Sequence, residues 1–383
     1  VGYLELGKTN LNWIDPAFSN DFSPRWSPDG SQLAFIRTPA EGGSVDSLTQ
    51  RKRIPWAIRK VGLTPSEKSI LVWEAPNNYR GSLPTTHGGT NLYWPKQDRL
   101  VFTSYHDGWP HIYSVAATGG TPLLLSPGEF MVEHLSVSSD GNMVYFDANT
   151  GTDPTDKDRR HVCQVSVDKA DMKVLTPGTG IEWSAISVAG GYAYIGAGSQ
   201  KAPQLMLSLG ASVKSLTESL IPSEFPAKLL VEPKQVIFKS LDGLTIHGQL
   251  FDNTNGSQKK PAIIFVHGGP PRQMLLGWHY SDYYSNAYAL NQYLANLGFV
   301  VLSVNYRLGI GYGYDFHNPK SAGQWGASEY LDIKAAGEWL AQQSFVDAKK
   351  IALYGGSYGG YLTALALARD SKLFAAGVDI HGV

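Results

Sequence analysis

LYGGSYGGYL, residues 353–362, places Ser357 at the centre of a G-x-S-x-G motif. The apolar run IALY before the motif is typical of a short buried strand, and residues 361–368 favour a helix because they contain neither Gly nor Pro. A serine on such a tight strand-to-helix turn forms a nucleophile elbow. Side chains at Gly355 and Gly359 would collide there with neighbouring backbone. We therefore predict a catalytic serine; the alternative is a glycine-rich loop between a strand and a helix.

A second glycine-rich turn, HGGP at residues 267–270, directly follows a predicted strand at residues 262–266. Backbone N–H groups of such a turn can point toward the space above the serine, where they form an oxyanion hole with the amide of Tyr358. One donor of this kind typically contributes about 2.7–4 kcal/mol at the transition state. We predict an oxyanion loop here, although the same string in isolation would more often be only a tight loop.

The second half of the chain alternates strand and helix patterns. Residues 236–239 and 244–251 flank an Asp-Gly turn and predict a hairpin. The later predicted strands are residues 262–266, 299–304, 351–354 and 376–380. The predicted helices are residues 286–297, with Leu290, Leu294 and Leu297 on one stripe, and residues 328–342, with Leu331, Ala335 and Trp339 on one stripe. This order predicts a mostly parallel sheet covered by helices, which presents the elbow at the carboxyl end of a strand.

The first 220 residues carry a loose repeat in which an apolar or aromatic residue precedes a turn and a further strand. The equivalent positions Trp26, Trp94, Val137 and Val188 are spaced by 68, 43 and 51 residues. The last two spacings approach the propeller-blade period of roughly 40 to 50, and the first requires an insertion. Further strand pairs at residues 111–126 and 161–176 bring each unit to four strands, as in a blade. The alternative is an ordinary antiparallel sandwich.

Length and composition limit the function classes. At 383 residues the chain exceeds the size of a single core, and three prolines within residues 219–233 indicate a crossing between two domains. The formal charge is −1, from 32 basic and 33 acidic residues, which argues against a nucleic-acid surface. Cys163 is the only cysteine, so an internal disulfide and a thiolate metal cluster are excluded, and we interpret it as a small apolar strand residue.

The segment GTDPTDKDRR contains Asp153, Asp156 and Asp158 and could suggest a cation loop. It lacks the EF-hand spacing, and the adjacent basic residues favour a solvated turn, so we predict no metal. The first residues have neither a basic start nor an apolar stretch, and the longest apolar runs are far below about 18 residues. We therefore predict neither a signal peptide nor a membrane span.

Five strings resemble the prolyl oligopeptidase family of serine peptidases, especially its acylaminoacyl-peptidase and dipeptidyl-aminopeptidase-like branch. They are HGGP (267–270), NYRLGIGYG (305–313), GASEYLDIKAA (326–336), GGSYGGY (355–361) and AGVDIHGV (376–383). The upstream repeats look like the propeller that such enzymes carry as a cap. The resemblance implies a partial β-propeller of about four to five blades at residues 1–225, followed by a partial α/β hydrolase at residues 226–383, without a cofactor.

The resemblance also implies roles for individual residues. Ser357 matches the nucleophile, and the amides of Gly269 and Tyr358 match the oxyanion donors. His267 occupies the position where some relatives supply a side-chain donor.

Four further positions match residues around the site in the family. The Tyr358 ring and Val383 match residues that line the pocket for the side chain before the scissile bond. Arg307 and Tyr312 match a loop near the site, where this chain reads NYRLGIGYG and relatives often read NYRGSxGYG.

A serine nucleophile needs a base and an acid, which in this fold follow it in the order acid, then His. Only 26 residues follow Ser357, and apart from Asp370 at the end of the elbow helix they contain one acid, Asp379, and one histidine, His381. These two side chains would share one face of an extended strand, and we interpret His381 as part of the pocket-side strand end. By resemblance the acid and base lie on later strands, so the remainder of the polypeptide completes the triad and the propeller.

Together these predictions describe a serine-type oligopeptidase, aminoacyl-peptidase or dipeptidyl-peptidase that acts on short peptides through an acyl-enzyme, with the propeller excluding folded proteins. Relatives that remove dipeptides often anchor the substrate amine with a Glu-Glu pair, and this chain has none. An esterase or lipase, and a non-catalytic propeller binding protein, stay open as alternatives. Similar enzymes are often exported, which favours a bacterial periplasmic or secreted protein over a cytoplasmic one.

Overall fold

The structure, a computed structural model, describes residues 1–40, 52–64, 66–85, 89–151, 153, 155–253 and 258–383. These residues form two compact units, each built from several segments of the chain. The first unit consists of Val1–Ala148, Val162–Leu175 and Ser184–Tyr192. The second unit consists of Asn149–His161, Thr176–Trp183 and Ala193–Val383.

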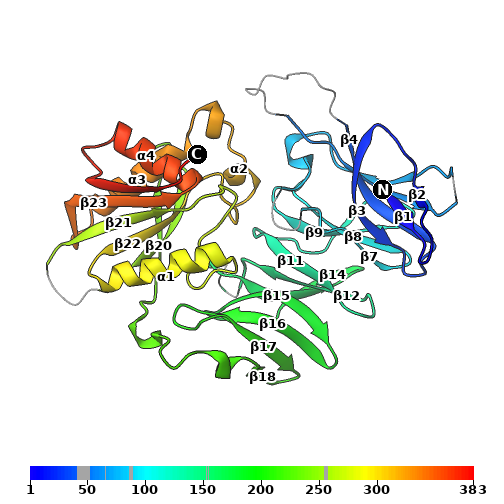
Figure 1. The fold of residues 1–383 in the computed structure, drawn as a ribbon, viewed down its shortest axis with the longest axis horizontal. Coiled ribbons are helices and arrows are strands. Elements are labelled where there is room, and N and C mark those ends of the chain that lie inside the picture. The colour runs from blue at the N-terminus through cyan, green and yellow to red at the C-terminus, as the bar shows by residue number, and fades with distance from the viewer. Residues whose placement is uncertain (41–51, 65, 86–88, 152, 154, 254–257) are drawn as a thin grey trace. The chain divides into compact units, whose positions relative to one another are not determined.

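After the short hairpin of β1 (Gly2–Leu4) and β2 (Leu11–Trp13), the described residues form four four-stranded sheets (Figure 1). The first contains β3 (Ser19–Trp26), β4 (Gln32–Pro39), β5 (Ala57–Gly62) and β6 (Ile70–Glu74); the second contains β7 (Tyr93–Lys96), β8 (Arg99–Ser104), β9 (His111–Ala116) and β10 (Leu123–Leu124). The third contains β11 (Val132–Val137), β12 (Met143–Ala148), β13 (His161–Ser166) and β14 (Lys169–Val174); the fourth contains β15 (Ile181–Val188), β16 (Gly191–Ala197), β17 (Gln204–Leu209) and β18 (Ser212–Ser215). In each sheet neighbouring strands are consecutive in the chain.

The repeat predicted from the sequence matches these sheets. Trp26, Trp94, Val137 and Val188 lie in β3, β7, β11 and β15, so each occupies the first strand of a sheet. The four-stranded units of a β-propeller are therefore confirmed, and the sandwich alternative is wrong. The long first spacing includes residues 41–51, which lie outside the described residues.

One kind of turn closes the first hairpin of both the first and the third sheet. Ser27 Oγ donates to Asp29 Oδ1 at 2.6 Å, and Ser138 Oγ donates to Asp140 Oδ1 at 2.6 Å. The glycines that follow these two aspartates have φ of 71° and 70°, in the left-handed region that glycine adopts without a Cβ clash. The shared Ser-x-Asp-Gly pattern thus explains why both segments fold back in the same way.

The second unit contains a six-stranded mixed sheet in the order β19-β20-β22-β21-β23-β24. Its strands are β19 (Lys234–Lys239), β20 (Thr245–Phe251), β21 (Lys260–Val266), β22 (Val300–Asn305), β23 (Val346–Gly356) and β24 (Ala376–Ile380). The helices are α1 (Asp282–Asn296), α2 (Tyr314–His317), α3 (Glu329–Ala341) and α4 (Tyr358–Arg369), and the short 3₁₀ helices of the chain are η1 (Tyr79–Gly81), η2 (Glu218–Leu220), η3 (Ala227–Leu229) and η4 (Gly323–Trp325). The predicted α/β arrangement is confirmed, although β23 begins earlier than expected.

The order of the strands determines where a site can form. From β21 the chain crosses to β22 on one side, and β23 later pairs with β21 on the other side, with both pairs parallel. Loops diverge at such a switch point and leave a crevice at the carboxyl ends of the strands. In the β21–β23 register Val266 lies opposite Gly355, so the residues that follow them are brought together.

Helices cover both faces of this sheet, with α1 on one side and α3 and α4 on the other (Figure 1). β22 is buried along its whole length, as expected for a strand with both faces covered. The stripe that predicted α1 is not its buried face, because Leu290 is 40% exposed and Leu297 is 57% exposed. The helix instead buries Tyr284, Tyr288 and polar side chains such as Asn291, which accepts a hydrogen bond from the sheet at Tyr354 Oη, 2.7 Å away.

Cys163 is completely buried in β13, which confirms it as a small apolar strand residue, and burial raises the pKa of its thiol. None of the helices in the described ranges is long and apolar enough to span a membrane.

Candidate active site

The chain turns sharply between β23 and α4, and Ser357 is the residue at the turn. Its backbone has φ 55° and ψ −123°, which is a strained conformation for a residue that carries a side chain. Strained backbone conformations of this kind cluster at functional sites. Ser357 N donates to Ile380 O at 3.0 Å, and Ser357 O accepts from Tyr361 N at 3.0 Å. These bonds to β24 and to the first turn of α4 hold the conformation, and the serine side chain stays partly exposed. The predicted strand–turn–helix elbow is therefore present.

The glycines on either side of the serine are required by close backbone contacts. A Cβ atom at Gly355 would lie 2.5 Å from Val266 O, and one at Gly359 would lie 2.0 Å from the same oxygen. Real Cβ atoms do not approach backbone this closely, so the collisions predicted at both positions are confirmed. The absence of side chains lets the elbow pack directly on the end of β21.

The HGGP turn lies against the nucleophile. A Cβ atom at Gly268 would be 3.2 Å from Ser357 Cβ and 2.5 Å from Gly356 O. Two tyrosine hydroxyls fix the turn, because Tyr284 Oη donates to Gly268 O at 2.8 Å and Tyr306 Oη donates to His267 O at 2.8 Å. With both carbonyls held in this way, the turn is rigid where its peptide groups border the serine.

The ring of His267 is completely buried in this turn. It stacks on Tyr306, with ring centroids 4.3 Å apart, and its Nδ1 atom lies 3.2 Å from Gly268 O. Burial lowers the pKa of His267 to about 4, so the imidazole is neutral near pH 7. Its Nε2 atom is buried without a hydrogen-bond partner among the described residues.

Two family models match this chain. The prolyl oligopeptidase family model matches residues 286–383, which include the elbow. This part of the chain is similar to the prolyl oligopeptidase family. A model of the dipeptidyl peptidase IV (DPP IV) N-terminal region matches residues 75–202, where the four-stranded sheets lie. The family resemblance predicted from the five strings is confirmed.

Individual relatives show the same similarity. The chain is 40% identical over 122 residues to dipeptidyl aminopeptidase BIII of Pseudoxanthomonas mexicana, covering 32% of this chain and 16% of that protein. It is 38% identical over 120 residues to dipeptidyl peptidase family member 6 of Caenorhabditis elegans, covering 31% and 15%. The solved structure of a puromycin-hydrolyzing peptidase of Mycobacterium tuberculosis matches with a TM-score of 0.75 at 19% identity, over 95% of this chain and 54% of that one. This chain therefore spans about half of the solved structure and a much smaller share of the two curated relatives.

The two residues predicted to line the pocket before the scissile bond differ in exposure. Tyr358, the first residue of α4, is half-buried against the core of the sheet, and its hydroxyl donates to Glu329 Oε1 at 2.5 Å. Burial, together with the bond to Glu329, raises the pKa of Tyr358 above its ordinary value. Val383 is 79% exposed at the last position.

The other two predicted site residues, Arg307 and Tyr312, follow β22 and bind other protein groups. The buried Arg307 guanidinium places Nη2 at 2.6 Å from Asp332 Oδ1 and Nη1 at 2.6 Å from Asp242 Oδ2. The Tyr312 hydroxyl donates to the buried Asp158. In the described ranges no hydrogen bond joins either side chain to Ser357, so the structure does not bring these two residues to the elbow by a direct polar contact.

The remaining acid and histidine, Asp379 and His381, lie at the exposed end of β24. Asp379 Oδ1 accepts from Gly382 N at 2.7 Å, and His381 has φ 42°. Asp370 ends α4 as expected, where it pairs with Lys334 Nζ at 2.7 Å. The location of the acid and base outside residues 1–383 stays a prediction.

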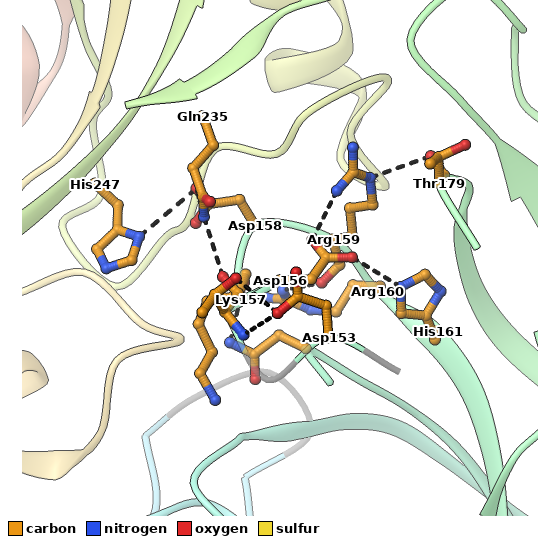
Figure 2. Close-up of polar contacts among 12 residues, drawn as sticks. Asp153, Asp156, Lys157, Asp158, Arg159, Arg160, His161, Thr179, Gln235 and His247 are labelled. Carbon is orange, nitrogen blue, oxygen red and sulfur yellow. Dashed lines mark hydrogen bonds and ion pairs between the residues drawn. The ribbon is translucent and has the colours of Figure 1, made fainter. Parts of the chain in front are cut away.

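The acidic segment, Asp153 and residues 155–161, belongs to the same compact unit as the elbow. Figure 2 shows its polar contacts. Asp158 is completely buried; its Oδ2 accepts from Gln235 Nε2 at 3.0 Å and its Oδ1 from Gln273 Nε2 at 3.2 Å. Arg160 is also completely buried and donates to Gln273 Oε1 at 2.8 Å. The prediction of a solvated turn is therefore wrong for these two side chains. Their partners lie far along the sequence, so no local pattern indicates the burial.

This segment supplies no metal site in the described part of the chain, where no three His, Cys, Asp or Glu side chains are grouped to hold an ion. A cavity of about 600 Å³ adjoins it, and its lining includes Asp153, Asp156, Arg159, Glu232 and Lys234. The residues of the elbow and of the HGGP turn are absent from that lining, so the cavity is separate from the candidate active site.

His161 ends the acidic segment as a buried imidazole between two carboxylates. Its Nδ1 lies 3.1 Å from Glu182 Oε2 and its Nε2 lies 3.4 Å from Asp156 Oδ2. Burial alone lowers the pKa of His161, but the bonds to Asp156 and Glu182 outweigh burial and raise it to about 9, from an ordinary value of 6.5. The protonated ring therefore stabilises the folded state.

The raised pKa of His161 predicts a pH-dependent stability. The stabilisation is fully present below pH 6.5 and is lost as the pH rises through about 9. The difference between the two pKa values, 6.5 and about 9, corresponds to a contribution to the free energy of unfolding on the order of 3 kcal/mol. We expect the urea midpoint of the full-length protein to fall across this range, and we expect His161→Gln to flatten the fall. The exposed His381 provides the control: a variant His381→Gln should keep the wild-type slope, and a wild-type slope in His161→Gln would contradict the prediction.

Sequence reasoning missed three side chains that hold the candidate active site together: Glu329, Tyr284 and Tyr306. Glu329 and Tyr306 stand inside the strings GASEYLDIKAA and NYRLGIGYG, which could have directed attention to them. Tyr284 lies on α1 and reaches the HGGP turn through its hydroxyl, a contact without any sequence signal.

Proposed function

We propose that this protein is a serine peptidase that hydrolyses short peptides through an acyl-enzyme on Ser357. The observation that carries the proposal is the strained, partly exposed serine with a rigid glycine turn packed against it. Relatives named dipeptidyl aminopeptidase and dipeptidyl peptidase support a peptide substrate for a protein with this elbow. An aminoacyl- or dipeptidyl-peptidase is the form of the activity that we favour.

In the proposed reaction Ser357 Oγ attacks the carbonyl carbon of the scissile bond while a base accepts the hydroxyl proton. The amides of Gly269 and Tyr358 donate to the carbonyl oxygen as it becomes negative. The bond between carbon and nitrogen then breaks, and the amine leaves with the proton. Water attacks the resulting ester and restores the serine. We assign the base and acid to residues of the polypeptide outside this chain, as the family resemblance implies.

We further propose that residues 1–225 are part of a propeller that limits substrate size and that residues 226–383 are part of the catalytic domain. The change from sheets of consecutive strands to a mostly parallel sheet supports this division. His267 is a candidate third oxyanion group because its buried Nε2 atom has no partner among the described residues. Val383, Arg307 and Tyr312 stay candidates for the surroundings of the substrate.

A fluorophosphonate probe tests the proposal directly. The full-length protein is expected to form a covalent adduct at Ser357, identified by mass spectrometry of its peptides. The variant Ser357→Ala serves as the matched control and should stay unlabelled. An adduct at another serine, or none at all, would contradict the proposed function.

A further inference from the structure

A buried carboxylate holds the ring that follows the nucleophile. Glu329 is the first residue of α3 and is completely buried. Its Oε1 accepts from Tyr358 Oη at 2.5 Å, and its Oε2 accepts from the backbone amide of Gly323 at 2.9 Å. The two oxygens of one side chain thus connect the elbow to the loop before α3.

The surroundings leave the Tyr358 hydroxyl little freedom. Gly323 has φ 57°, and a Cβ atom there would lie 3.9 Å from Tyr358 Oη, so the loop borders the hydroxyl as well as bonding Glu329. A hydrogen bond to a buried carboxylate is stronger than one between neutral groups, and leaving its partner unsatisfied is costly. A tyrosine ring has only two side-chain torsions. Fixing its hydroxyl therefore fixes the whole ring.

Glu329 is not needed to join the two helices. Lys334 on α3 already pairs with Asp370 at the end of α4, at 2.7 Å, and the Tyr330 hydroxyl donates to the same carboxylate. These contacts bind α3 to α4 away from the elbow. The bond from Glu329 acts on the Tyr358 ring itself.

We propose that Glu329 is a positioning residue for substrate specificity: by fixing the Tyr358 ring, it determines which side chain before the scissile bond the enzyme accepts. The inference rests on the proposed function, because it concerns the pocket that the Tyr358 ring is proposed to line. Glu329 itself does not act on the reacting atoms. Its loss should therefore change the choice between substrates more than the rate on the better one.

The test uses the full-length protein and two peptide p-nitroanilides that differ only in the residue before the scissile bond, alanine or phenylalanine. We expect Glu329→Ala and Tyr358→Phe each to change the ratio of the two kcat/KM values by about tenfold, the size of effect typical of altered pocket contacts. Glu329→Gln should change it less, because an amide oxygen can still accept one of the two bonds. The double variant Glu329→Ala with Tyr358→Phe should match the single variants, since both remove the same contact.

Glu338, on the same helix, provides the matched control, and Glu338→Ala should leave the ratio unchanged. Equal losses on both substrates together with a lower melting temperature would show a purely structural role and overturn the inference. The inference would also be overturned if the wild-type protein is active and Tyr358→Phe has the same ratio of the two kcat/KM values, because this variant keeps the ring and the backbone amide. A wild-type protein that neither hydrolyses the anilides nor reacts with fluorophosphonate would remove the proposed function, and this inference with it.

Discussion

Gly359→Ala is expected to lower kcat by about a hundredfold to a thousandfold. The new Cβ atom would lie 2.0 Å from Val266 O and 2.8 Å from His267 O, and both are backbone oxygens that cannot rotate away. The elbow must shift to relieve the contact, and a displacement near 1 Å in a catalytic constellation costs on the order of a hundredfold. The shift also moves the amide of Tyr358, and losing one oxyanion donor costs about 10²–10³ in kcat.

The rate of fluorophosphonate labelling at Ser357 depends on the same serine and oxyanion geometry, so it should fall together with kcat and can be measured without choosing a substrate. Circular dichroism reports whether the variant is folded. Gly198→Ala is the matched control in the same compact unit, because the nearest atom to its Cβ would be Lys201 Cβ at 3.8 Å. We expect it to label at the wild-type rate. Wild-type labelling of Gly359→Ala would show that the elbow does not depend on this contact.

Asp332→Ala is expected to destabilise the protein by about 3–5 kcal/mol, the usual cost of removing one member of a buried ion pair. Asp332 is completely buried, accepts from Arg307 Nη2 at 2.6 Å and from Ser240 Oγ at 2.6 Å, and also accepts from the backbone amide of Arg307 at 2.9 Å. Its removal leaves a buried guanidinium with only one carboxylate partner. The midpoint of urea unfolding, followed by tryptophan fluorescence, measures the loss.

The second partner of Arg307 provides the comparison. The Asp242 side chain is 42% exposed and binds the same guanidinium at 2.6 Å, so Asp242→Ala should cost no more than about 1 kcal/mol, as solvent-screened pairs usually do. A similar loss in both variants would mean that burial does not distinguish the two carboxylates, and the argument for Asp332 would fail.

Most of the fold could be predicted from local patterns in the sequence. The elbow was predictable because Gly355 and Gly359 have a steric reason to be glycine and stand between an apolar run and a helix-forming run. The blades were predictable because Trp94, Val137 and Val188 recur at spacings of 43 and 51 residues, close to the period of a propeller blade. The buried face of α1 was not predictable, since it depends on polar groups such as Asn291 whose partner, Tyr354, lies on a distant strand.

The parts of the site that depend on backbone position were predictable from the sequence. The parts that depend on contacts between side chains far apart in the sequence were not. Ser357 and the HGGP turn were each predicted to follow a strand of the same sheet, and the structure pairs these two strands in parallel. Glu329 supports Tyr358 from another helix, and its position in the first turn of α3 is equally typical of an acid that only favours the helix N-terminus. Asp158 and Arg160 show the same difficulty, because charged residues in a loop are normally solvated.

The discontinuous make-up of the second unit has a consequence for biosynthesis. The Asn149 side chain donates to Gly311 O across 162 positions, and Arg160 reaches Gln273 across 113 positions. The ribosome releases the earlier residue of each pair long before its partner, so the nascent polypeptide lacks these two partners of Asn149 and Arg160 until the later loops emerge. Closing such wide gaps slows assembly and prolongs exposure to misfolding. Newly made molecules should consequently depend on chaperones more than a domain of similar size with local contacts.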